Sequence, residues 1–136
     1  MIKITALALF GFATVALADE PAKAPSMPPA STKTDVTYAT DIKSIFDASC
    51  VKCHSGEKPK AGLRMDTLEN ILKGGKGGKD KVVTPGDSAN SPLVKSIAHM
   101  GDQDGWMPPL HNRANIAPLT EEQVGLVRAW IDQGAK

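Results

Sequence analysis

The sequence Cys50-Val51-Lys52-Cys53-His54 is the most informative stretch of this chain. Its two cysteines are the only ones present, and their spacing spans about one helical turn, so both sulfurs can face the same way. Cys-x-x-Cys followed directly by His is the attachment sequence for c-type haem, whose vinyl groups form thioethers with the cysteines. His54 can then turn one imidazole nitrogen to the iron. The motif predicts one covalently bound haem, held by Cys50, Cys53 and His54.

Two other uses of paired cysteines stay open beside haem attachment. A redox-active dithiol of the thioredoxin type occurs in a β-α-β setting, and a structural zinc site needs two further ligands at suitable spacing. The sequence has neither pattern, and the histidine that directly follows Cys53 favours haem.

The first 18 residues have the pattern of a signal peptide. Lys3 precedes an apolar run over residues 4–17, and Ala16-Leu17-Ala18 has the small residues of a signal-peptidase site. The run is shorter than the roughly 20 apolar residues of a membrane-spanning helix, and two threonines interrupt it. We expect cleavage after Ala18, a periplasmic location and no stable membrane insertion of the mature protein. An uncleaved membrane anchor is the alternative.

The rest of the chain divides into a linker and one domain. Residues 19–35 are rich in Pro and Ala, a composition that cannot bury a core and is typical of an extended tether. Residues 36–136 then form a single domain of about 100 residues, which is a small core for independent stability. A buried haem would supply part of the missing apolar mass.

The charge pattern gives no indication of nucleic-acid binding and suggests a partner surface. Lys3 is the only charged residue that signal cleavage would remove, which leaves 15 basic and 15 acidic residues in the mature chain. Between residues 52 and 81, however, eight basic residues stand against four acidic ones. We expect this Lys-rich region to carry the positive end of the domain and to steer acidic redox partner proteins toward the haem. Ordinary solubility is the alternative role of these lysines.

Apolar spacing and capping residues predict an all-α fold. The first expected helix has Ile42 and Phe46 on its apolar stripe and leads into the haem motif. Asp66 is the expected N-cap of the second, and Thr120 with Gln123 forms a capping box at the start of the last. The four expected helices cover residues 38–49, 67–73, 92–99 and 121–133. We therefore predict about four short helices, with long loops, wrapped around one haem.

A Cys-x-x-Cys-His motif after an amphipathic helix, a methionine-containing loop and an aromatic terminal helix together resemble a class I c-type cytochrome. In that family the first and last helices cross, which implies that Ile42 and Phe46 pack against Val127, Trp130 and Ile131. Over about residues 36–135 the chain also resembles the planctomycete-type cytochrome c domain. The narrower similarity rests on Gly62-Leu63-Arg64-Met65-Asp66-Thr67, Pro85-Gly86-Asp87, Ser91-Pro92-Leu93, Met107-Pro108-Pro109 and Trp130-Ile131-Asp132-Gln133-Gly134-Ala135.

The resemblance also implies the second axial ligand. In that family the methionine of Met-Pro-Pro binds the iron on the distal side, which corresponds to Met107. A thioether is a neutral ligand that raises the reduction potential, and the flanking prolines stiffen the loop that presents it. Met65 lies too close to the haem motif to be the first choice. Met100 is the alternative methionine, while His99 or His111 would give a bis-histidine haem of lower potential.

Three more side chains are candidates for contact with the haem edge. Trp106 could stack there or donate its indole N–H to a propionate, or it could belong to the core. Arg64 and Arg113 could pair with propionates, because guanidinium matches carboxylate geometry, or they could be solvated surface charges.

These residues predict a periplasmic c-type cytochrome that carries single electrons and is not an enzyme. Haem iron changes between ferric and ferrous states, so no substrate-binding residues are needed. Two alternatives stay open. An open distal site would make the chain a haem-binding sensor or a peroxidase-like protein, with His99 or His111 as the acid and base. The domain could also be the electron-transfer subunit of a larger periplasmic dehydrogenase.

Overall fold

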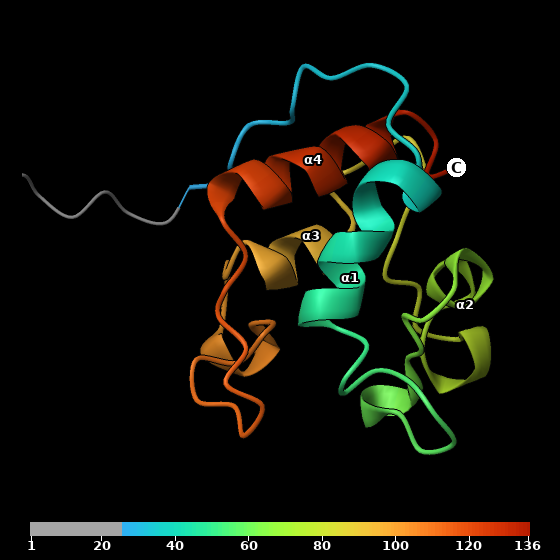
Figure 1. The fold of residues 1–136 in the computed structure, drawn as a ribbon, viewed down its shortest axis with the longest axis vertical. Helices are drawn as coiled ribbons and strands as arrows, with labels where there is room; N and C mark the ends of the chain where they lie inside the picture. The colour runs from blue at the N-terminus through green and yellow to red at the C-terminus, as the bar shows by residue number, and fades with distance from the viewer. Residues whose placement is uncertain (1–25) are drawn as a thin grey trace, which may run out of the picture.

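A computed structural model describes residues 26–136 and shows an all-α domain (Figure 1). The predicted signal peptide and the first part of the predicted tether lie outside the described residues. Apart from one isolated bridge between Gly75 and Asp80, residues 26–136 contain no strand. Among these residues no helix combines the length and apolar character needed to cross a membrane. The α-helices are α1 (Lys43–Ser49), α2 (Leu68–Lys73), α3 (Pro92–Ile97) and α4 (Glu121–Asp132).

The fold class and the four short helices predicted from the sequence are thus confirmed. The segment expected at residues 38–49 forms in two consecutive pieces, because a π-helical turn, η1 (Tyr38–Ile42), precedes α1. Ile42 and Phe46 are completely buried, as their apolar spacing predicts. The amide of Cys50 donates to the carbonyl of Phe46 at 2.8 Å, so the helix leads directly into the haem motif.

Helix α2 begins one residue later than the sequence suggests. The hydroxyl of Thr67, not the carboxylate of Asp66, accepts the Asn70 amide at 3.2 Å, so Thr67 is the N-cap. Asp66 instead accepts from the Asn70 side chain at 2.8 Å. The helix ends at Gly74, as expected, with φ of 84°. A Cβ on Gly74 would lie 2.3 Å from the Asp80 carbonyl oxygen, so the chain needs glycine there.

Helix α3 is held by the turn that precedes it. The Ser91 hydroxyl donates to the Asp87 carbonyl at 2.9 Å and accepts the Thr84 amide at 2.9 Å. The turn is also joined to α4, because the Ser88 amide and hydroxyl donate to the Asp132 carboxylate at 2.8 and 3.0 Å. These contacts fix α3 beside α4, where it forms one wall of the functional site.

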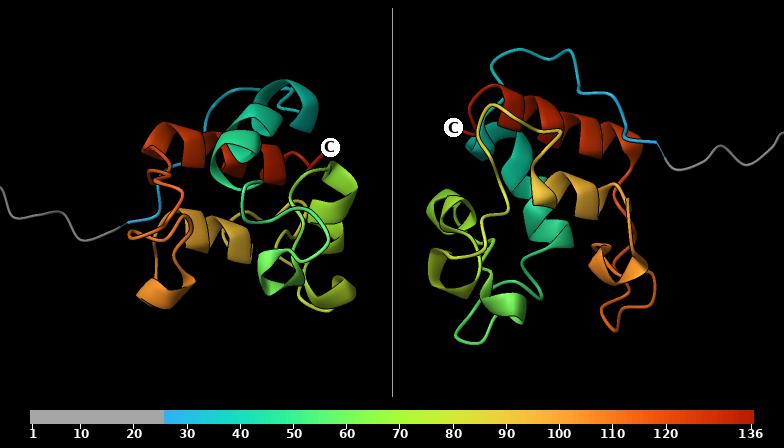
Figure 2. Two further views of the ribbon diagram at one scale, coloured as in Figure 1. Left: turned by 60° about the horizontal axis from the view of Figure 1, so that its bottom comes forward. Right: turned by 180° about the vertical axis from the view of Figure 1, so that it is seen from behind.

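The core lies where η1 and α1 cross α4, in the arrangement that the family resemblance implied (Figures 1 and 2). Trp130 of α4 is completely buried, and its ring centroid lies 6.0 Å from Phe46 and 6.3 Å from Tyr38. The Trp130 indole N–H donates to the Lys136 carbonyl at 3.0 Å. The predicted capping box of Thr120 and Gln123 is present and begins α4.

Residues 28–33, which we call the N-terminal strap, lie along α4. Figure 1 and both views of Figure 2 show this segment beside the helix. The Ser31 amide donates to the Gly125 carbonyl at 2.9 Å. A Cβ on Gly125 would lie 2.7 Å from the Pro29 carbonyl oxygen, so the strap approaches α4 where the helix has no side chain. Contacts with the helical domain therefore begin before residue 36.

Candidate functional site

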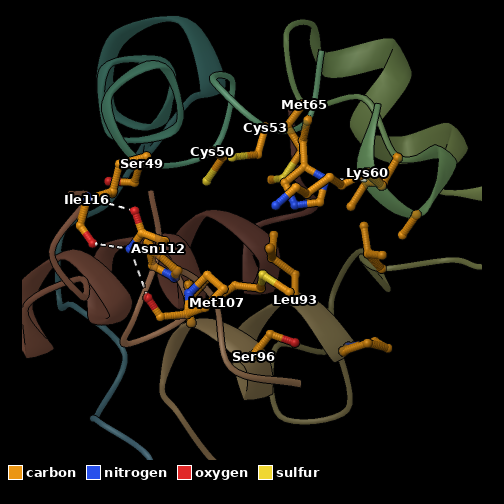
Figure 3. A pocket seen from close by; sticks show the side chains of 18 residues that line it. Ser49, Cys50, Cys53, Lys60, Met65, Leu93, Ser96, Met107, Asn112 and Ile116 are labelled. Atoms are coloured by element: carbon orange, nitrogen blue, oxygen red, sulfur yellow. Dashed lines mark hydrogen bonds between the residues drawn. The ribbon is translucent and has the colours of Figure 1, made fainter. Parts of the chain in front are cut away.

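A pocket of about 280 Å³ lies between the end of α1, helix α3 and the loop that precedes α4 (Figure 3). Most of the side chains around it are apolar. Cys50, Cys53 and His54 line it from one segment of the chain, and Met107 lines it from another. The structure therefore brings together all four residues that the sequence analysis selected for haem binding.

The two cysteines lie on one side of the pocket because the chain makes a tight turn after α1. The amides of Cys53 and His54 both donate to the Cys50 carbonyl, at 3.1 and 3.0 Å. Cys50 is buried, Cys53 is partly buried, and both thiols are free. Figure 3 shows both sulfurs at the same edge of the pocket, the placement needed for two thioether bonds to one macrocycle.

The environment of Cys50 does not suit a redox-active dithiol. Burial, and then the neighbouring Cys53, raise the pKa of the Cys50 thiol to about 12. Reactive dithiols have lowered pKa values instead, because the thiolate is the nucleophile. Among residues 26–136 no group of three His, Cys, Asp or Glu side chains could hold a metal ion. A mostly apolar pocket with two cysteines at one edge suits haem attachment.

His54 is held in an orientation suited to an axial ligand. Its ring nitrogen Nδ1 lies 3.1 Å from the Lys60 carbonyl oxygen, and because a carbonyl only accepts, Nδ1 carries the proton. Nε2 is then the nitrogen with a lone pair available to a metal. The His54 carbonyl accepts the Met65 amide at 2.7 Å, so the backbone is fixed as well. His54 is 9% exposed.

Met107 enters the pocket from the loop that precedes α4. Figure 3 shows its side chain extending into the space that faces Cys50 and Cys53. Its amide donates to the Ser96 carbonyl at 3.0 Å, which ties the loop to α3. The pocket is therefore lined by both an imidazole and a thioether, the ligand types found together in cytochromes of high potential.

The three alternative distal ligands do not line the pocket. The Nε2–H of His99 donates to the Pro108 carbonyl at 3.0 Å, so this nitrogen already has a partner. Met100 lines a separate, open surface depression beside residues 102–105. His111 is exposed.

The three candidates for contact with the haem edge do not line the pocket either. Trp106 is partly buried and stacks on His99. Arg64 is exposed and pairs with Asp66 at 2.6 Å. Arg113 is exposed on the loop before α4. Their proposed contacts with propionates stay predictions.

The residues present fit a c-type haem. The pocket is lined by two thiols, by an imidazole that the Lys60 carbonyl orients, by the Met107 thioether and by mostly apolar side chains. Comparison with known protein families supports the same conclusion, because residues 50–111 match the family described as Planctomycete cytochrome C. The match begins at Cys50 and extends past Met107.

Residues 50–111 form a planctomycete-type cytochrome c domain. The similarity recognised from the sequence motifs is therefore confirmed, and haem-based electron transfer is the activity that this family indicates. Neither the comparison with curated proteins nor the comparison with solved structures gave a match.

One residue that lines the pocket, Asn112, was missed by sequence reasoning. Asn112 donates from Nδ2 to the carbonyls of Pro109 and Ile116, both at 2.8 Å, and its Oδ1 accepts the Ile116 amide at 2.9 Å. It thereby closes the loop that carries Met107. Asparagine in a proline-rich loop was the available signal, because its side chain often bonds to nearby backbone. Met65, only 2% exposed, also lines the pocket from the side of the haem motif.

Proposed function

We propose that this chain is a periplasmic carrier of single electrons and not an enzyme. One haem would be attached through Cys50 and Cys53, with His54 and Met107 as its axial ligands. The observation that carries the proposal is the pocket, in which these four residues meet although Met107 is far from the others in sequence. Domains of this family are typically exported, which agrees with the signal peptide expected at residues 1–18.

Each part of the site has a role in this function. When bound, the haem supplies the one-electron chemistry, through the ferric and ferrous states of its iron. The Lys60 carbonyl orients the His54 ring, and the Ser96 carbonyl anchors Met107 to α3. Apolar walls such as Leu93 and Ile97 exclude water, so that few polar groups must reorganise when the charge of the site changes.

The axial ligands can be tested by optical spectroscopy of the mature, haem-loaded protein. A methionine bound to ferric haem gives a weak sulfur-to-iron absorption at the red end of the visible spectrum. We expect this band in the wild type and in the control Met100→Ala, and its loss in Met107→Ala. A wild type without the band, whose reduced form binds carbon monoxide readily, would instead indicate an open distal site and a sensor or peroxidase-like protein.

The partner surface proposed for the carrier is the Lys-rich region of residues 52–81. Lys52, Lys58 and Lys60 are exposed close to the cysteines. Changing all three to Gln should slow electron transfer to an acidic partner several-fold at low salt and have little effect at high salt. Changing the exposed Lys95 and Lys136 to Gln is the control. Equal rates in the two variants would remove the support for this docking surface.

A further inference from the structure

The Met-Pro-Pro segment has an unusual shortage of backbone donors. Pro108 and Pro109 have no N–H group, so Met107 supplies the only backbone donor of these three residues. That donor is used by the Ser96 carbonyl at 3.0 Å. The segment can otherwise be held in place through its carbonyl oxygens, which need donors from elsewhere in the chain.

Side chains provide those donors. The carbonyl of Pro108 accepts from Nε2 of His99 at 3.0 Å, and the carbonyl of Pro109 accepts from Nδ2 of Asn112 at 2.8 Å. Asn112 lines the pocket and belongs to the same loop. His99 does not line it and lies at the start of the same loop, next to the C-cap of α3, so its bond connects the segment to the point where the chain leaves the helix.

The His99 ring makes a second contact, with the residue directly before the Met-Pro-Pro segment. Its plane is stacked on the indole of Trp106, with ring centroids 4.8 Å apart and an angle of 10° between the planes. The indole N–H of Trp106 donates to the Gly101 carbonyl at 3.1 Å, which holds the stack in place. His99 therefore contacts the residues on both sides of Met107, Trp106 before it and Pro108 after it.

The backbone of His99 supports this interpretation. Its φ is 52°, in the left-handed region that residues other than glycine adopt only at some cost in energy. His99 directly follows Ala98, the C-cap of α3. Its ring contacts Trp106 and Pro108 in this conformation. A non-glycine residue in this region persists when its surroundings over-determine it.

We propose that His99 is a positioning residue for the axial methionine. It acts through the Pro108 carbonyl and the Trp106 ring to hold the Met107 sulfur toward His54, and so slows the departure of the sulfur from iron. This inference rests on the proposed function, because it requires Met107 to be the distal ligand. It assigns His99 a role other than that of an iron ligand.

The test measures how fast methionine leaves the ferric iron. Imidazole added to the oxidised, haem-loaded protein can bind only after Met107 departs, so its limiting binding rate reports that step. In His99→Ala we expect this rate to rise about tenfold, the effect of losing one hydrogen bond and a ring contact. His99→Gln keeps a donor for Pro108 and should show a smaller increase. His111→Ala changes an exposed histidine of the same loop and is the matched control.

The outcomes separate this inference from the proposed function. A wild type without the sulfur-to-iron band contradicts Met107 ligation, whatever the variants do. A wild type with the band, and equal imidazole rates in His99→Ala and His111→Ala, leaves Met107 as the ligand and overturns the role of His99. Failure of both His99 variants to fold and load haem would also overturn that role, because His99 would then be a residue needed for folding.

Discussion

The two sides of the pocket are built in different ways. On the proximal side, the residues that would attach the haem lie within the five consecutive positions 50–54. Their positions depend on short-range contacts, such as those from the His54 amide to the Cys50 carbonyl and from the His54 ring to the Lys60 carbonyl. A local turn after a helix is enough to place them.

On the distal side, one side chain from an irregular loop must reach the same pocket. Met107 is held by Ser96 at the backbone and, through its neighbours, by His99 and Asn112. Of the three residues that hold this segment, only Ser96 belongs to a helix. The position of His54 thus follows from the local sequence, whereas the position of Met107 depends on a set of separate contacts within and beyond its loop. Damage to the first side should remove the haem, and damage to the second should change only its ligation or the stability of the loop.

The largest effect should come from the proximal side. Replacing both Cys50 and Cys53 with Ala should abolish covalent haem attachment, because no other thiol exists in the chain. Intact-protein mass spectrometry would show the mass of the polypeptide without haem. Ser49→Ala, at a neighbouring position that also lines the pocket, should keep the full haem mass. Retention of covalent haem in the double variant would contradict the assignment of these cysteines.

A smaller effect is expected on the distal side from Asn112→Ala. This change removes three hydrogen bonds that close the loop and leaves two carbonyls and one amide without their partner. We expect the free energy of unfolding to fall by about 2 kcal/mol, with covalent haem retained. Urea denaturation of the haem-loaded protein would measure it. Arg113→Ala, at an exposed position of the same loop, is the control, and equal stability of the two variants would contradict the prediction.

The N-terminal strap provides a test outside the pocket. Ala at position 125 would normally favour the helix, but its Cβ would lie 2.7 Å from the Pro29 carbonyl oxygen. The strain of that contact should exceed the gain in helix propensity, so Gly125→Ala should lower the free energy of unfolding by about 1 kcal/mol. Thermal denaturation would measure this, with the exposed Glu122→Ala as control. A stabilised Gly125→Ala variant would show that the strap does not pack there in solution.

The smallest expected effect is on the stability of the fold at low pH. Hydrogen bonds from Lys33, Thr40 and Thr37 lower the pKa of the Asp41 carboxyl from 3.8 to about 2. A lowered pKa means that the carboxylate stabilises the fold above about pH 4, and that this contribution is lost as the pH falls toward 2. Asp41→Asn should therefore lose less stability than the wild type over this interval, measured by unfolding at each pH. Glu57→Gln, in an exposed loop, should behave like the wild type.

Most of the helices could be predicted, because the sequence patterns that indicate them involve residues close together in the chain. The capping box of Thr120 and Gln123 involves residues three apart, and the buried stripe of Ile42 and Phe46 follows from helical spacing. The predicted N-cap of α2 was wrong by one position. Both Asp66 and Thr67 can cap a helix, and only the contacts of Asn70 distinguish them. The periodic segments thus tolerate small errors in their boundaries.

The strap and the loop contacts were beyond sequence reasoning for another reason. Pro28 and Pro29 lie in a composition typical of a tether, and nothing in the strap itself indicates that a glycine far along the chain leaves room for it. His99 was considered only as a possible ligand or as an acid and base, since the position of its partner, the Pro108 carbonyl, depends on the path of an irregular loop.

The sequence alone determined the all-α class, the planctomycete-type cytochrome c domain and the residues expected to bind haem on the proximal side. It could do so because Cys50, Cys53 and His54 are neighbours in the covalent chain, where spacing carries the chemistry. Only the tertiary structure decided which side chain of the distal loop lines the pocket with His54. That loop has no helical period, and its path depends on side-chain donors within the loop that bond to its own carbonyls and on the bond from the Met107 amide to α3.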